Sequence, residues 1–485
     1  MRAEDCIVVD RKELRKAQLG AGVGNFIEWY DIGIYGYLAV TMTSVFTEGM
    51  DESLGLLVTL LGFAVSFIVR PLGGMILGPL GDKIGRQKVL FFTMALMAGA
   101  TTLIGLLPSA GQVGLWIIIP LYLLKMLQGF STGGEFSGAS TYVAEFSPDS
   151  RRGFWTALLN AGSMLGFAFG AAVVALTSAA VTSAWGEGAM LAGGWRIPFL
   201  LALPLGIVAI VMRSRIPESP SFEAAQEHGE SESELDPIFV RHDLKNIFRH
   251  YWPQILIGCA LIAADGTSQY MLTSYMPTYL ETQLGAPAAH TAVAAVTVLL
   301  LQVVLIPLVA TWSDKIGRRP MYRIATIGNL VLLLPAFWLM QQGTLASLYL
   351  ALFLVALPSA FFLAMTGAVM SELFPTASRY GGVGVTHNLA ISIFGGTTPL
   401  VGQLLVQLTG NPYAPAYYIM FFSVLALIAV AMMRETAQRP LLGSVPVVSS
   451  RAEAERLAGG QDEDDRIDTS TMLLGEEPKV GASSI

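Results

Sequence analysis

Twelve apolar stretches follow one another along this chain, and each is long enough to cross a lipid bilayer as a helix. About 20 residues at about 1.5 Å each span a hydrocarbon core of about 30 Å. Only 13% of the residues are charged, about half the share in soluble domains. The sequence therefore predicts an all-α membrane protein with twelve transmembrane helices, at approximately 17–45, 53–79, 89–108, 113–142, 154–178, 194–212, 252–280, 291–312, 321–340, 345–370, 383–408 and 415–433.

The Lys and Arg residues indicate how these helices are oriented. All but three of the 29 fall on the side of the two termini, and the exceptions are Arg70, Lys125 and Arg196. Cytoplasmic loops carry the excess of Lys and Arg in membrane proteins. We therefore expect both termini in the cytoplasm.

The longest polar insertion divides the stretches into six and six. Its sequence has an acidic run followed by basic residues, which is typical of a tether between two bundles. We expect an N-terminal bundle over 1–212, a cytoplasmic linker over 213–250, a C-terminal bundle over 251–433 and an acidic tail over 434–485. The tail is polar, and its composition predicts at most a short helix around 451–457.

A repeated loop motif relates the two halves. The sequence GDKIGR at 81–86 returns as SDKIGR at 313–318, 232 residues later, and a weaker echo returns Glu145 and Arg152 as Glu372 and Arg379. Repeats at equivalent places indicate two similar bundles that rock about a central cavity, which is alternating access. A carboxylate at one helix end can accept hydrogen bonds from a neighbouring helix N-terminus. We interpret these loops as a conformational latch made by Asp82, Arg86, Glu145, Arg152, Asp314 and Arg318.

The first copy of this motif, at 78–88, resembles the loop signature of the major facilitator superfamily. Four other segments resemble its metabolite–proton symporter branch: 24–31, 70–74, 128–135 and 194–199. Within that branch, 270–280 and 434–441 most resemble the bacterial proline/betaine transporters. The resemblance covers about residues 10–445. It implies a major facilitator fold in a bacterial inner membrane and proton-coupled uptake of osmoprotectants such as proline and glycine betaine. The best-known members carry a long C-terminal coiled coil, whereas this tail is short and acidic, so osmotic activation stays open.

Ionisable residues inside the spans carry the mechanistic predictions, because such groups are costly in a membrane and usually functional. We assign the substrate carboxylate to Lys125, on one helix face with Gln128. Proton binding is assigned to one or more of Glu28, Asp31 and Glu135, with Asp265 as a further candidate of open role. Arg70 is expected to make a structural ion pair.

Aromatic residues supply the other half of a zwitterion site. A quaternary ammonium group is attracted to aromatic faces by cation–π interaction. The candidates are Trp29, Tyr30, Tyr35, Trp155 and Tyr270.

Other function classes are excluded or less favoured. An ATP-driven pump is excluded because no Lys is followed by Ser or Thr, as a P-loop requires, and no pattern predicts an enzyme, a metal, a cofactor or a nucleic-acid partner. Two alternatives remain: a proton symporter for a carboxylate such as 2-oxoglutarate, citrate or shikimate, and an osmosensor that does not transport. A dicarboxylate would need a second cation in the cavity. Arg70 facing the cavity would favour that alternative.

Overall fold

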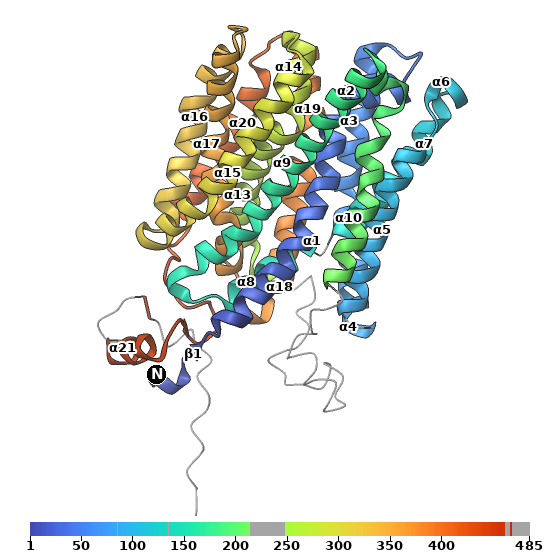
Figure 1. Cartoon of the computed structure of the whole chain (residues 1–485). Helices are drawn as coiled ribbons and strands as arrows, with labels where there is room; N and C mark the ends of the chain where they lie inside the picture. Colours follow the sequence, from blue (N-terminus) through green and yellow to red (C-terminus); the bar gives the residue numbers. More distant parts are fainter. Residues whose placement is uncertain (85, 134, 214–247, 461–465, 468–485) are drawn as a thin grey trace, which may run out of the picture.

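Long helices run side by side through the computed structural model, and each predicted stretch is one helix or a pair of helices in line (Figure 1). The structure describes residues 1–84, 86–133, 135–213, 248–460, 466 and 467. Within these ranges it does not describe the side chains of residues 13, 17, 78, 79, 81–84, 86, 87, 90, 135–137 and 377. We refer to 1–213 as the N-terminal half and to 248–432 as the C-terminal half.

The first span of the N-terminal half is a pair of helices, and the fifth belongs to one very long helix. Its helices are α1 (Arg11–Tyr37), α2 (Ala39–Phe46), α3 (Glu52–Ile68), α4 (Arg70–Ile84), α5 (Arg86–Leu106), α6 (Ala110–Val113), α7 (Ile118–Thr132), α8 (Glu135–Phe146), α9 (Arg152–Trp185) and α10 (Arg196–Arg213). The C-terminal half has π-helical turns in two of its spans, at Met271–Tyr275 and Ile391–Gly395. Its helices are α13 (Trp252–Tyr270), α14 (Met276–Leu284), α15 (Ala288–Ile316), α16 (Arg318–Met340), α17 (Leu345–Glu372), α18 (Thr376–Ala390), α19 (Thr398–Thr409) and α20 (Ala414–Met432).

Within the described part of the chain, ten helical segments are long and apolar enough to cross a membrane. The third predicted stretch contributes a shorter apolar helix, Phe91–Leu106. The first is helical as α1 and α2, and polar residues inside it, Asn25, Glu28 and Asp31, dilute its apolar character. The predicted helical membrane fold is confirmed. The fourth stretch, drawn from the sequence as one helix, is divided between α7 and α8.

The two halves meet along α9, which packs along α15 of the other half and along α1 of its own. A Cβ on Gly166 would collide with the carbonyl oxygen of Phe26, so glycine is what lets α9 and α1 approach so closely. Across the halves, Asn160 donates from α9 to the Leu363 carbonyl at 2.7 Å. At the end away from the termini, Gln407 donates to the Ser53 carbonyl at 3.3 Å. The halves are thus held together in the middle and at the far end.

The N-terminal segment and the described part of the tail meet beneath the bundle (Figure 1). Strand β1 (Ile7–Val8) pairs in parallel with β2 (Val447–Val448), and the predicted short tail helix is present as α21 (Arg451–Gly460). Burial opposes ionisation of Glu453 in the first turn of α21, but hydrogen bonds from Ser449 outweigh it and lower the pKa of that carboxyl. The sequence did not predict this small sheet.

Candidate functional site

Lys125 on α7 has its ammonium group against aromatic rings. Its Nζ lies 4.2 Å from the centre of the Tyr35 ring and 6.0 Å from that of Phe63, and the side chain is buried. Among the described side chains it forms no ion pair. A buried ammonium held by ring faces alone is stabilised by about 2 kcal/mol or more, far less than its desolvation costs. The site is therefore suited to an incoming anionic group.

Arg70, at the start of α4, has a carboxylate partner instead. Its Nη2 donates to Oε1 of Glu28 at 2.9 Å, and both side chains are buried. The guanidinium also lies 4.3 Å from the centre of the Phe67 ring and 5.7 Å from that of Trp29. The structural ion pair predicted for Arg70 is present, so its charge is neutralised by the protein.

The C-terminal half reaches this region through Tyr270, the last residue of α13. Its ring centre lies 5.0 Å from that of Phe67, 6.2 Å from that of Phe63 and 6.0 Å from that of Trp29. The aromatic cluster of Trp29, Tyr35, Phe63, Phe67 and Tyr270 therefore lies between Lys125 and Arg70 and joins the two halves. All five side chains are buried.

Asp31 on α1 is connected to the helix that carries Lys125. Its Oδ2 accepts a hydrogen bond from the Thr101 hydroxyl on α5 at 2.9 Å, and Thr101 in turn accepts one from Gln128 Nε2 at 2.6 Å. The other carboxyl oxygen, Oδ1, is buried without a hydrogen bond. Lys125 and Gln128 are three residues apart on α7 and so share a face. The predicted proton and substrate residues are thus linked by Thr101.

Asp265 on α13 has a similar environment in the C-terminal half. Its Oδ2 accepts from the Thr366 hydroxyl on α17 at 2.6 Å, and its Oδ1 is buried without a hydrogen bond. One turn further along α13, Gln269 accepts from the Ser359 hydroxyl. No described Lys or Arg forms an ion pair with Asp265.

Two predicted site residues lie away from this cluster, and the side chain of a third is not described. Tyr30 points elsewhere, since its hydroxyl donates to the Pro198 carbonyl at 2.7 Å. Trp155 is half-buried near the start of α9 and stacks edge-on with Phe154. The side chain of Glu135 lies outside those the structure describes.

A second polar site lies at the end of the bundle that carries the termini. Asp314, at the end of α15, accepts hydrogen bonds from the backbone N–H groups of Gly153 and Phe154, both at 2.9 Å. These groups belong to the first turn of α9, so the carboxylate caps a helix of the other half. Arg318 then pairs with Asp314 at 2.8 Å. Gly317, between α15 and α16, has a φ of 119°, which only glycine adopts readily.

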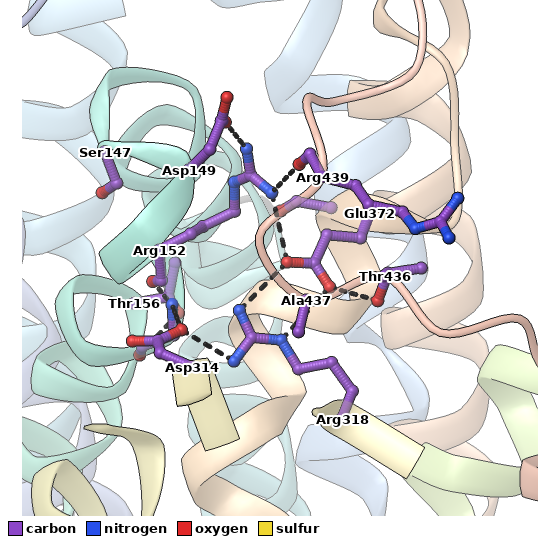
Figure 2. A network of polar contacts seen from close by, with 12 residues as sticks. Ser147, Asp149, Arg152, Thr156, Asp314, Arg318, Glu372, Thr436, Ala437 and Arg439 are labelled. Carbon is purple, nitrogen blue, oxygen red and sulfur yellow. Dashed lines mark hydrogen bonds and ion pairs between the residues drawn. The ribbon is translucent and has the colours of Figure 1, made fainter. Parts of the chain in front are cut away.

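Glu372 at the end of α17 joins arginines from both halves (Figure 2). Its Oε1 lies 3.2 Å from Arg152 Nη1 and 3.2 Å from Arg318 Nη2. Arg152 also pairs with Asp149 within its own half. All four side chains are buried. Removing one member of such a network leaves a buried charge unpaired, which costs roughly 3–5 kcal/mol.

The echo of this motif makes the reciprocal contact. Arg379 on α18 pairs with Glu145 on α8 at 2.7 Å, so each half supplies an arginine to a glutamate of the other. The first copy of the loop motif cannot be compared in this way. The side chains of Asp82 and Arg86 lie outside those described.

The segment after α20 lies across this network. Thr436 donates to Glu372 Oε2 at 2.5 Å, and the Arg439 carbonyl accepts from Arg152 at 3.1 Å. Further on, the N–H of Val447 donates to Asp149 at 3.0 Å. The tail segment therefore contacts both halves, a contact that its polar sequence did not reveal.

Sequence reasoning missed Phe63, Phe67, Thr101 and Glu372 as site residues. Phe63, Phe67 and Arg70 recur at helical spacing (i, i+4, i+7), which could have placed both phenylalanines on the face of the arginine. Glu372 was noted only as a repeat of Glu145. Thr101 carried no signal, because threonine is common in membrane helices as a donor to its own backbone.

Comparisons with known proteins agree with this architecture. The model of the family described as "Sugar (and other) transporter" matches residues 17–444. The chain is 51% identical to the ectoine/proline transporter ProP of Corynebacterium glutamicum, over 99% of this chain and 96% of that protein. It is 38% identical to the proline/betaine transporter of Escherichia coli K12, covering 93% of this chain and 90% of that protein.

Another relative is the glycine betaine/proline/ectoine/pipecolic acid transporter OusA of Dickeya dadantii, at 38% identity over 94% of this chain and 90% of that protein. Among solved structures, the proton:xylose symporter XylE superposes with a TM-score of 0.69 at 18% identity, covering 88% of this chain and 97% of XylE. A partially occluded, inward-open structure of XylE from E. coli gives 0.65 at 18% identity, with coverage of 87% and 98%. At this identity the likeness concerns the fold.

Proposed function

The chain belongs to the sugar (and other) transporter family of the major facilitator superfamily, and we propose that it is a proton-coupled symporter importing small zwitterionic osmoprotectants by alternating access. It is a transporter and not an enzyme. Relatives named for proline, betaine and ectoine, at 51% and 38% identity over nearly their whole length, support solutes of this class.

One observation supports the substrate assignment: the buried ammonium of Lys125 lies on the faces of Tyr35 and Phe63 and forms no ion pair with any described carboxylate. The carboxylate of a zwitterion would pair with this ammonium. Its cationic group would then lie on the aromatic cluster, where a desolvated cation–π contact is worth about 2 kcal/mol or more. Proline, glycine betaine and ectoine each combine a carboxylate with a cationic nitrogen-containing group, which fits such a pair of subsites.

Proton binding is assigned first to Asp31. Its Oδ1 has no hydrogen bond, its Oδ2 has one from Thr101, and a buried ionised carboxylate supported by so few donors is costly. A proton removes that cost. Glu28, which pairs with Arg70, and Glu135 and Asp265 remain further candidates.

The network around Glu372 is proposed to be the latch of alternating access. It joins α9 of one half to α15, α16 and α17 of the other at the end of the termini. Inward opening must separate Arg152 from Glu372 and the start of α9 from Asp314. The latch therefore favours conformations closed at this end.

The protein is proposed to lie in a bacterial inner membrane with both termini in the cytoplasm, surrounded by lipid. The orientation rests on the Lys and Arg residues, nearly all of which fall on the side of the termini. The latch then faces the cytoplasm. We propose no oligomeric state.

The two alternatives have weaker support. A dicarboxylate symporter needs a second available cation, and Arg70 is paired with Glu28 at 2.9 Å. An osmosensor that does not transport would bind solute without accumulating it. Osmotic activation of transport is a separate property, and the same experiment tests it.

The test is uptake of labelled proline and glycine betaine by the full chain in proteoliposomes. Each solute is measured with and without an inward proton gradient and at two osmolalities, with liposomes lacking protein as the control. Accumulation that requires the gradient is the expected result, and an increase with osmolality would establish osmotic activation. Uptake of neither solute under any condition would contradict the proposal, and 2-oxoglutarate, citrate and shikimate would be tested next.

A further inference from the structure

The hydroxyl group of Thr101 lies between the proposed proton site and the proposed substrate helix. Thr101 is fully buried on α5, its Oγ1 is 2.9 Å from Asp31 Oδ2 on α1, and it is 2.6 Å from Gln128 Nε2 on α7. Three helices of the N-terminal half thus meet at one side-chain oxygen.

The hydrogen-bond geometry of Thr101 allows two arrangements. Its single hydroxyl proton has two acceptors within reach, Asp31 Oδ2 at 2.9 Å and the Met97 carbonyl at 3.0 Å. A hydroxyl donates one hydrogen bond at a time and can accept two. In the structure the amide nitrogen of Gln128 faces this oxygen and donates to it. With Gln128 as the donor, the Thr101 proton can turn to either of its two acceptors.

We propose that Thr101 is a positioning residue that transmits the protonation state of Asp31 to Gln128. When Asp31 is ionised, the Thr101 hydroxyl donates to Oδ2. When Asp31 takes a proton from the aqueous side at Oδ2, that new O–H donates to Thr101 Oγ1, and the threonine proton turns to the Met97 carbonyl. No other covalent bond changes, and the proton stays on Asp31 until it is released to the opposite side.

The two arrangements hold Gln128 differently. In the first, Gln128 donates to a hydroxyl that itself donates to an anion, and such a chain is strengthened by polarisation. In the second, the Thr101 oxygen accepts two hydrogen bonds and its proton points to a neutral carbonyl, so its hold on Gln128 is weaker. Protonation of Asp31 thus releases Gln128, which lies on the same face of α7 as Lys125, to bind the solute.

This inference rests on the proposed function, because it assumes a proton on Asp31 and a solute at Lys125. The charged groups that act on Asp31 are Lys125 from α7 and Glu28 from its own helix, with Tyr30 beside it in the chain. The path from Asp31 through Thr101 to Gln128, which we call the relay, therefore lies within the electrostatic reach of the Lys125 ammonium.

The experiment compares Thr101→Val with Thr102→Val, each in the full chain in proteoliposomes. Thr102 is the matched control, because its hydroxyl donates to the Ala98 carbonyl at 2.7 Å within α5. Two quantities are measured with labelled proline: accumulation driven by a proton gradient, and solute exchange at equal pH on both sides. The number of protons taken up per solute is recorded with a pH-sensitive dye inside the liposomes.

For Thr101→Val we expect accumulation and the proton-to-solute ratio to fall by about tenfold, the scale of one lost hydrogen bond to a charged group, while exchange continues. Thr101→Ser should restore both, and Thr102→Val should resemble the wild type. If Thr101→Val does not fold, Thr101→Ala gives the same comparison. Wild-type accumulation in the Thr101 variant, or failure of serine to restore it, would overturn the relay.

Asp31→Asn separates the two proposals. If Asp31→Asn accumulates proline as the wild type does, Asp31 is not the proton site and the proposed coupling fails with the relay. If Asp31→Asn loses accumulation while Thr101→Val keeps it, the proton site stands and the relay alone is wrong.

Discussion

The two halves share a framework but differ in the charges that they bury. Both carry the loop motif and the Glu–Arg echo, and each has a buried aspartate hydrogen-bonded by a threonine, Asp31 with Thr101 and Asp265 with Thr366. Beyond this, the N-terminal half adds Lys125 and the Arg70–Glu28 pair. Around the site, the C-terminal half contributes mainly aromatic and small polar groups, such as Tyr270, Gln269 and Thr366.

This difference indicates which functions need equivalent residues in both halves and which need them in one half only. In the proposed mechanism both halves rock and lock against each other, so both need the latch residues. A zwitterion needs one cationic anchor and a proton needs one carboxyl, and a single half can supply both. The other half then has to close over the solute, for which the Tyr270 ring is suited because it already packs across Phe63 and Phe67.

The largest expected effect is at the junction between the halves. Arg152→Ala should destabilise the conformation that is closed at the end of the termini by roughly 3–5 kcal/mol, because Glu372 and Asp149 each lose an ion-pair partner. Spin labels at Lys88 and Lys315, in a cysteine-free background, should then report a longer distance between the halves.

The control for this change is Arg319→Ala. Among the described residues, its guanidinium donates to the carbonyl groups of Val430 and Ala431 alone, within the C-terminal half. An unchanged label distance in Arg152→Ala, or an equal increase in Arg319→Ala, would show that the network does not hold the two halves closed.

The next largest effect tests whether the N-terminal half supplies the cationic anchor for the solute. Lys125→Met keeps the length of the side chain and removes the ammonium, so binding of proline should weaken roughly ten- to hundredfold. Binding is measured by scintillation proximity on purified protein, with the exposed Lys315→Met as the control. Binding at the wild-type level would mean that the carboxylate is held elsewhere.

A smaller contrast compares the two aspartates directly. Asp31→Asn should abolish gradient-driven accumulation, because an amide cannot take up the proton. Asp265→Asn keeps an oxygen that can accept from Thr366, so we expect uptake within about threefold of the wild type. Uptake by both variants is measured under the same proton gradient. Greater loss of uptake in Asp265→Asn than in Asp31→Asn would place the proton site in the C-terminal half.

The smallest effect concerns the hydroxyl of Tyr270, which is buried without a hydrogen bond. Tyr270→Phe should change the KM for glycine betaine by less than about twofold, since no hydrogen bond is lost. Tyr270→Leu removes the aromatic face and should raise that KM more than tenfold, on the scale of about 2 kcal/mol for a desolvated cation–π contact. Equal effects of the two variants would show that the ring is not used for the cation.

The sequence by itself determined the helical membrane fold and the order of its helices, because hydropathy is a local property of the chain. It also predicted the ion pair of Arg70 and the capping role of the loop aspartate, seen at Asp314. The tertiary structure alone decided which side chains meet: Lys125 with Tyr35, Thr101 with Asp31, and Glu372 with arginines of both halves. These contacts depend on the rotation and register of helices far apart in the chain, which come from packing and leave no local pattern.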